Sequence, residues 1–160
     1  MKIFSIGHST RPSQEFIDLL RMHHIDRIID VRKYPTSKRF PQFDQRNLSE
    51  DLKSNQIDYV HIPELGGFRE EGYLAFSKSE EFEAAFSVLI KEIENRNACI
   101  MCSERLFYRC HRRQIAERLV TLGHTVFHIL DQSTVTQHKP EMPEMQLKLF
   151  CDKVEKPKSA

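Results

Sequence analysis

Residues 98–113, Ala98-Cys-Ile-Met-Cys-Ser-Glu-Arg-Leu-Phe-Tyr-Arg-Cys-His-Arg-Arg113, pass from a short apolar run into a polar loop and then into a helix. The run from Ala98 to Met101 is apolar throughout, which is typical of a central parallel strand buried on both faces. After Cys110, apolar residues recur at helical spacing until Gly123. A strand, a loop and a helix N-terminus in this order are where open α/β folds bind ligands.

The same alternation of strand and helix extends along most of the chain. We predict strands at 2–6, 27–31, 58–62, 98–101 and 125–130, and helices at 12–23, 45–55, 77–95 and 110–122. This order predicts an α/β fold with a doubly wound, mostly parallel five-stranded sheet and helices on both faces. Residues 132–160, with prolines and alternating charges, predict an extended tail. We therefore expect one α/β domain over residues 1–131 and a tail over 132–160.

The composition favours a cytoplasmic protein. No apolar run is long enough for a membrane span or a signal peptide, so we expect no membrane partner and free thiols rather than disulfides. The net charge of +1 hides an asymmetry, because residues 1–46 carry +4, residues 47–97 carry −6 and residues 98–122 carry +3. The two basic segments are either solvated helix faces or parts of a local anion site.

Polar residues and glycines follow four of the predicted strands directly. In a parallel sheet these strand ends meet at one edge, and hydroxyls, glycines and arginines beside a helix N-terminus are what an anion site needs. The alternative is that these loops are polar only because they are exposed. Our candidates for binding phosphate or nucleic acid are His8, Ser9, Thr10, Arg32, Arg39, Gly66, Gly67, Arg69 and Arg112.

Four side chains of the central stretch are candidates for catalysis. Cys110 lies at a helix start beside His111, which lowers a thiol pKa, and Cys102 is the other candidate nucleophile. Either thiol is alternatively a buried apolar group. Glu104 is a general acid or base, or a structural partner of an arginine. His111 is a base or a capping residue.

A zinc site is a further alternative, because Cys99-x-x-Cys102 followed by Cys110-His111 resembles zinc-ligand spacing. Cys99 lies inside the predicted strand, however, where residues three apart face opposite sides of the sheet. We therefore predict no metal site and no cofactor.

Several of these motifs together resemble the uncharacterised domain-of-unknown-function family 488. They are Ser5-Ile-Gly-His-Ser-Thr10, Asp30-Val-Arg32 with the loop from Pro35 to Phe43, Leu65-Gly-Gly67 with Arg69, and Met101-Cys-Ser-Glu104 followed by Cys110-His-Arg112. The resemblance covers about residues 1–130. It implies a small α/β domain that shares these polar motifs as a site, and it supplies no reaction.

The tail carries a second resemblance. Residues 146–150, Gln146-Leu-Lys-Leu-Phe150, are similar to the pentapeptide with which bacterial replication and repair proteins hold the DNA sliding clamp. Leu147, Leu149 and Phe150 would enter an apolar groove, while the Gln146 amide would orient the peptide. The alternative is a tail that docks on its own domain through the same side chains.

Together these features predict a protein of DNA repair or replication, tethered to the sliding clamp, with a phosphate-binding and catalytic site at the strand ends. Its expected partners are the clamp and DNA or a nucleotide. One alternative is an adaptor that binds the clamp and nucleic acid without catalysis. Another is a cysteine-dependent enzyme that acts on a small phosphorylated or nucleotide substrate.

Overall fold

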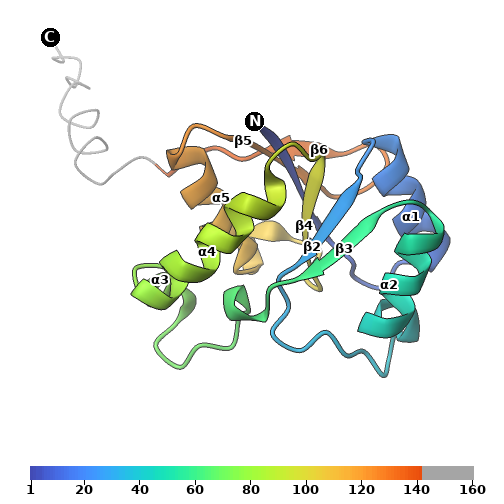
Figure 1. The fold of residues 1–160 in the computed structure, drawn as a ribbon, viewed down its shortest axis with the longest axis horizontal. Coiled ribbons are helices and arrows are strands. Elements are labelled where there is room, and N and C mark those ends of the chain that lie inside the picture. The colour runs from blue at the N-terminus through green and yellow to red at the C-terminus, as the bar shows by residue number, and fades with distance from the viewer. Residues whose placement is uncertain (142–160) are drawn as a thin grey trace, which may run out of the picture.

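A six-stranded sheet runs through the centre of the part of the chain that the structure, a computed structural model, describes, residues 1–141 (Figure 1). The five parallel strands are β1 (Lys2–Gly7), β2 (Arg27–Asp30), β3 (Asp58–His61), β4 (Ala98–Cys102) and β5 (Thr125–Ile129). A sixth strand, β6 (Val135–Gln137), pairs antiparallel with β5, and the strand order is β3-β2-β4-β1-β5-β6. The mostly parallel α/β fold is thus confirmed, with one strand more than the sequence indicated.

Helices cover both faces of this sheet. Two helices, α1 (Ser13–Met22) and α2 (Gln45–Ser54), share one buried core cluster with the sheet, and α4 (Glu80–Ile93) and α5 (Arg112–Thr121) share the other. The short helix α3 (Tyr73–Phe76) precedes α4, and 3₁₀ turns lie at Pro41–Phe43, Pro63–Leu65 and Phe107–Arg109. Along β4, Cys99 packs on the α1 side and Ile100 on the α4 side, as alternation along a strand requires. No helix in this part of the chain is long and apolar enough to cross a membrane.

The chain winds in opposite directions from the neighbouring strands β1 and β4. The connections after β1 and β2 lead toward β3, and their helices, α1 and α2, lie on one face of the sheet. The connections after β3 and β4 lead toward β5, and their helices, α4 and α5, lie on the other face. The loops that follow β1 and β4 therefore turn to opposite faces and leave a crevice between them, which is where open α/β sheets bind ligands.

Backbone contacts hold the two sides of this crevice together at its base. The His8 amide donates to the Cys102 carbonyl at 2.8 Å, and the Ser9 amide donates to the Ser103 carbonyl at 2.9 Å. A side chain on Gly7 would overlap the carbonyl oxygen of Glu104, so only glycine fits where β1 ends. The sequence thus brings the His8 turn and the loop after β4 into direct contact.

Candidate functional site

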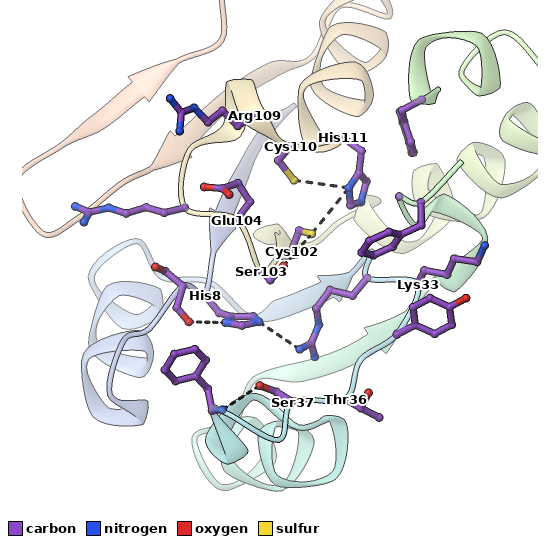
Figure 2. Close-up of a pocket in the computed structure, with 18 of the residues that line it drawn as sticks. His8, Lys33, Thr36, Ser37, Cys102, Ser103, Glu104, Arg109, Cys110 and His111 are labelled. Carbon is purple, nitrogen blue, oxygen red and sulfur yellow. Dashed lines mark hydrogen bonds between the residues drawn. The ribbon is translucent and has the colours of Figure 1, made fainter. Parts of the chain in front are cut away.

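A pocket of about 840 Å³ opens at the carboxyl edge of the sheet (Figure 2). All four strand ends that the sequence indicated contribute to it. The predicted residues that line it are His8, Ser9, Thr10, Arg32, Gly67, Arg69, Cys102, Glu104, Cys110 and His111. The parallel sheet therefore brings together groups that lie up to a hundred residues apart in the chain.

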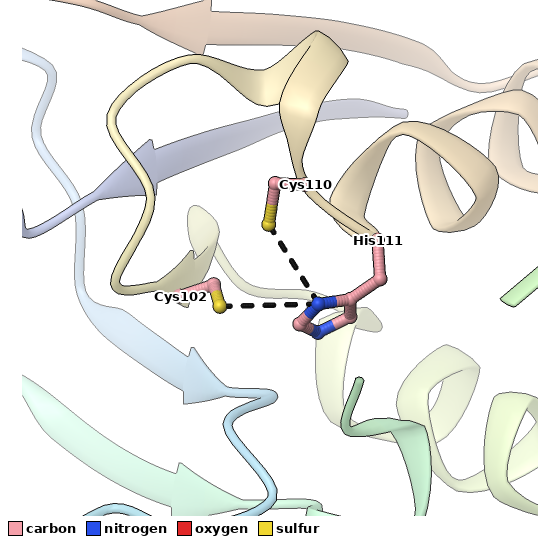
Figure 3. Close-up of side chains that lie close together, drawn as sticks. All are labelled: Cys102, Cys110 and His111. Carbon is pink, nitrogen blue, oxygen red and sulfur yellow. Dashed lines mark hydrogen bonds between the residues drawn. The ribbon is translucent and has the colours of Figure 1, made fainter. Parts of the chain in front are cut away.

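Two thiols and an imidazole converge at one point of the pocket wall (Figure 3). His111 Nδ1 lies 3.7 Å from Cys110 Sγ and 3.9 Å from Cys102 Sγ. The other ring nitrogen, Nε2, lies 3.0 Å from the carbonyl oxygen of Val31, to which it donates. This hydrogen bond fixes the ring so that Nδ1 faces both sulfur atoms.

Arg112 lies behind this cluster rather than in the pocket. It is the first residue of α5, only 1% of its surface is exposed, and its Nη1 donates to Ser5 Oγ at 2.8 Å. Its Nη2 donates to the backbone oxygen of Glu104, and its Nε donates to Cys110 Sγ at 3.4 Å. Within residues 1–141 no carboxylate forms a salt bridge with Arg112, and these three hydrogen bonds hold the buried guanidinium group instead.

The surroundings of the two thiols shift their pKa values in opposite directions. The Cys102 thiol, as a hydrogen-bond donor, lowers the pKa of Cys110 below its ordinary value, Arg112 lowers it further, and burial opposes both. The same hydrogen bond, together with burial, raises the pKa of Cys102. The surroundings of Cys110 therefore favour its ionised form, and those of Cys102 favour its neutral form.

His8 and Arg32 form a buried pair beside the cluster. His8 Nδ1 donates to the Ser9 carbonyl at 2.9 Å, and Nε2 accepts from Arg32 Nη1 at 3.3 Å. Burial lowers the pKa of His8 to about 4, so the ring is neutral at pH 7. Arg32 also binds the buried Asp30 carboxylate, with Nη2 at 2.7 Å from Oδ2. This pair therefore gives the pocket shape and hydrogen-bonding groups rather than net positive charge.

Other cations of the pocket come from positions that the sequence did not single out as binding residues. Lys33 and Arg109 line it, and within the described residues their side chains form no hydrogen bond or ion pair. Arg105 makes an exposed contact with Asp131 at 3.4 Å. Arg69 is more constrained, because it donates to two backbone carbonyls and lies over the Phe76 ring at 3.7 Å.

Two exposed aromatic rings stand at the same pocket. Phe68 is 83% exposed, Tyr34 is 63% exposed, and their ring centroids are 6.0 Å apart. Phe68 also adopts a positive φ of 59°, which is unusual for a residue other than glycine and is found most often at functional sites. The only sequence signal for Phe68 is its position directly after the two glycines of a polar loop.

The comparison with known families places the chain among relatives of unknown activity. The sequence pattern of the family described as "Domain of unknown function DUF488" matches residues 12–119. The chain belongs to the DUF488 family. No curated protein and no solved structure matches the chain.

The match to DUF488 includes the strand, loop and helix start that carry Cys102, Cys110, His111 and Arg112. The turn with His8 and the strands β5 and β6 lie outside the matched range. The family description assigns no reaction, so the chemistry of the DUF488 pocket has to be argued from its geometry.

Three residues that the sequence placed among the anion binders do not line the pocket of this DUF488 protein: Arg39, Gly66 and Arg112. Arg39 is exposed on the loop before the Pro41–Phe43 turn. Gly66 packs closely against the backbone of Lys33, because an added Cβ would lie 2.6 Å from the Cα of Lys33. Proximity to a strand end in the sequence therefore could not separate these three residues from those that line the pocket.

Proposed function

We propose that this protein is an enzyme of DNA metabolism that binds a nucleotide or a segment of DNA in the pocket at the sheet edge. The observation that carries this proposal is the combination of unpaired cations and exposed aromatic rings around the cluster of Cys102, Cys110 and His111. Phosphate and base are the two chemical groups that such a rim would recognise together.

The rim suits a ligand that is both charged and planar. Lys33 and Arg109 offer positive charge that no carboxylate of the described residues pairs with, and guanidinium groups bind phosphate oxygens in pairs of hydrogen bonds. Tyr34 and Phe68 offer ring faces, and stacking of a base on an aromatic ring contributes about 1–3 kcal/mol. A purely structural loop gains nothing from holding a phenylalanine in water at a positive φ.

The groups for chemistry lie within the same cavity. The Glu104 side chain is exposed there and accepts a hydrogen bond from the Leu106 amide at 3.1 Å, which leaves its second oxygen free for a proton transfer. Cys110 and His111 supply a thiol group and an imidazole in the same pocket (Figure 2). We propose these groups as the catalytic set.

The second part of the proposal concerns location. We propose that residues Gln146–Phe150 tether the domain to the bacterial sliding clamp, and this rests on the pentapeptide sequence alone, since it lies outside the described residues. Tethering would raise the local concentration of the pocket at DNA without any further contact.

Binding is tested with fluorescent single-stranded DNA and with single nucleotides. Arg109→Ala and Phe68→Ala should each weaken binding about tenfold, because one removes a phosphate contact and the other a stacking face. The exposed Lys91→Ala on α4, outside the pocket, is the matched control and should bind like the unchanged protein. Equal affinity in all four proteins would contradict the proposed binding site.

Catalysis is tested by mass spectrometry of the bound oligonucleotide or nucleotide after incubation. A mass change that the unchanged protein produces and Cys110→Ser does not would support an enzyme. Binding without any mass change would favour the adaptor function instead.

A further inference from the structure

We propose that Cys102, Cys110 and His111 bind a Zn²⁺ ion whose fourth coordination position opens into the pocket. The three ligand atoms lie within 4.8 Å of one another, and they come from the end of β4 and the residues just before α5. This revises our expectation that the chain has no metal site. The proposed zinc site rests on the positions of these three ligand atoms and does not depend on the substrate of the pocket.

The distances fit a tetrahedral ion. With Zn–S bonds of about 2.3 Å and a Zn–N bond of about 2.0 Å, a tetrahedral site separates sulfur from nitrogen by about 3.6 Å. His111 Nδ1 is 3.7 Å from one sulfur and 3.9 Å from the other, so each nitrogen-to-sulfur separation is within a few tenths of an ångström of the tetrahedral value, and all three ligand atoms lie within 4.8 Å of one another. These separations are long for hydrogen bonds from nitrogen to sulfur but are close to those of co-ligands on one ion.

The imidazole is also prepared for metal binding by its second nitrogen. Because Nε2 donates to the Val31 carbonyl, the neutral ring carries its proton there and leaves the Nδ1 lone pair directed at the two sulfurs. Histidines that ligate metals almost always make such a hydrogen bond through the other ring nitrogen. The sequence alone could not show this contact, which joins residues eighty positions apart.

Charge and space around the cluster agree with an ion. Two thiolates and a neutral imidazole cancel the charge of Zn²⁺, and Arg112 Nε, 3.4 Å from Cys110 Sγ, donates to a ligand sulfur from behind. On the open side, a Cβ on Gly67 would lie 3.2 Å from His111 Nδ1, so glycine keeps the front of the nitrogen clear.

Three protein ligands define the class of site. Within residues 1–141 no fourth His, Cys, Asp or Glu atom joins the group, and all three ligands line the cavity. Structural zinc sites are closed by four protein ligands, whereas catalytic sites keep one position for water or substrate. The site therefore belongs to the catalytic class, in which the ion polarises a bound water or a phosphate oxygen.

Cys99 is excluded from this site and supplies the matched control. It lies on the same strand as Cys102 but in the core cluster on the other face of the sheet. Cys151 is a second control, because it is the fourth cysteine of the chain and lies outside the described residues.

The experiment uses the full chain, reduced and stripped of metal, and titrates it with Co²⁺ and then Zn²⁺. The unchanged protein, Cys99→Ala and Cys151→Ser should each bind one ion per chain and show thiolate-to-cobalt charge-transfer absorption that Zn²⁺ abolishes. Cys102→Ser, Cys110→Ser and His111→Gln should each bind zinc at least about 100-fold more weakly, which exceeds the loss from removing a residue that only supports a ligand. Circular dichroism of the metal-free proteins confirms that each variant is folded.

The opposite results would overturn the proposal. It fails if the unchanged protein binds no better than the three ligand variants, or if Cys151→Ser abolishes binding. It also fails if the reduced protein forms a Cys102–Cys110 disulfide in air and binds no ion before that, which would mark a redox pair. Failure of the proposed nucleic-acid binding is a separate result, because Arg109→Ala should lose DNA affinity and keep zinc.

Discussion

Whether an arginine can bind a ligand in the pocket depends on the interior contacts that its guanidinium group already makes, and not on its charge alone. Arg32 binds Asp30, and Arg112 is enclosed behind Cys110, so both guanidinium groups are committed to interior contacts. Lys33 and Arg109 have no such partners among the described residues. We therefore expect replacement of Arg32 or Arg112 to destabilise the fold and replacement of Lys33 or Arg109 to leave it intact.

Gly7 offers a test of how closely the two loops of the crevice must approach. An alanine Cβ there would overlap the Glu104 carbonyl and lie 2.8 Å from Arg105 Cα, so the backbone would have to shift. We expect Gly7→Ala to lower the free energy of unfolding by about 2 kcal/mol or more in urea titrations. Gly123→Ala is the control, since nothing lies within 4 Å of its Cβ and its positive φ alone costs about 1 kcal/mol. Equal losses in both variants would show that the close approach is unimportant.

The sequence predicted which residues follow each strand but not how their side chains are paired. The positions of Cys102, Cys110 and His111 were predictable because a strand end and a helix start were recognisable. The contact of His111 with Val31, the burial of Arg112 and the exposure of Phe68 depend on packing between distant segments. No local pattern carries that information.

At the scale of the elements, a chain of hydrogen bonds joins β5, β6 and α5. His138 Nε2 donates to Glu117 Oε2 at 2.9 Å, so its Nδ1 accepts from His128 Nε2, at 3.0 Å. Glu117 Oε1 also accepts from the Glu141 amide at 3.1 Å. The segment after β5 is thereby fixed to the sheet and to α5. The sequence analysis assigned this segment to the tail because a three-residue exposed strand has no apolar alternation.

This chain of hydrogen bonds predicts a loss of stability in acid. Burial lowers the pKa of His128 from 6.5 to about 3, and its Nδ1 is buried without a partner among the described residues. The unfolded chain therefore binds more protons between these values, so stability is complete above pH 6.5 and falls as the pH drops toward 3. We expect His128 to remove about 2 kcal/mol from the free energy of unfolding between pH 7 and pH 5.

The measurement is urea unfolding at both pH values. His128→Gln should show a smaller loss than the unchanged protein, while the exposed His24→Gln should show the same loss. Some loss should remain in His128→Gln, because burial lowers the pKa of His8 to about 4 as well. An unchanged pH dependence in His128→Gln would contradict a buried neutral ring.

At the scale of the whole molecule, the described domain ends close to the proposed clamp peptide. The last described residue, Glu141, is bound to α5, and Gln146 follows five residues later. Five residues span at most about 17 Å, so a clamp bound at the peptide would lie close to α5. The clamp and the pocket would then act on the same stretch of DNA.

This arrangement predicts that clamp binding and pocket binding can be removed separately. Leu149→Ala combined with Phe150→Ala should abolish binding to a bacterial sliding clamp in titration calorimetry, because two of the three side chains expected to enter the apolar groove are lost. Lys148→Ala, at the polar position between Leu147 and Leu149, should bind the clamp normally, and Arg109→Ala should lose only DNA. A clamp that binds the double variant as tightly as the unchanged chain would show that the pentapeptide is not the tether. If the clamp binds neither the unchanged chain nor the double variant, the pocket has no link to DNA replication or repair. Its substrate would then have to be sought among free nucleotides.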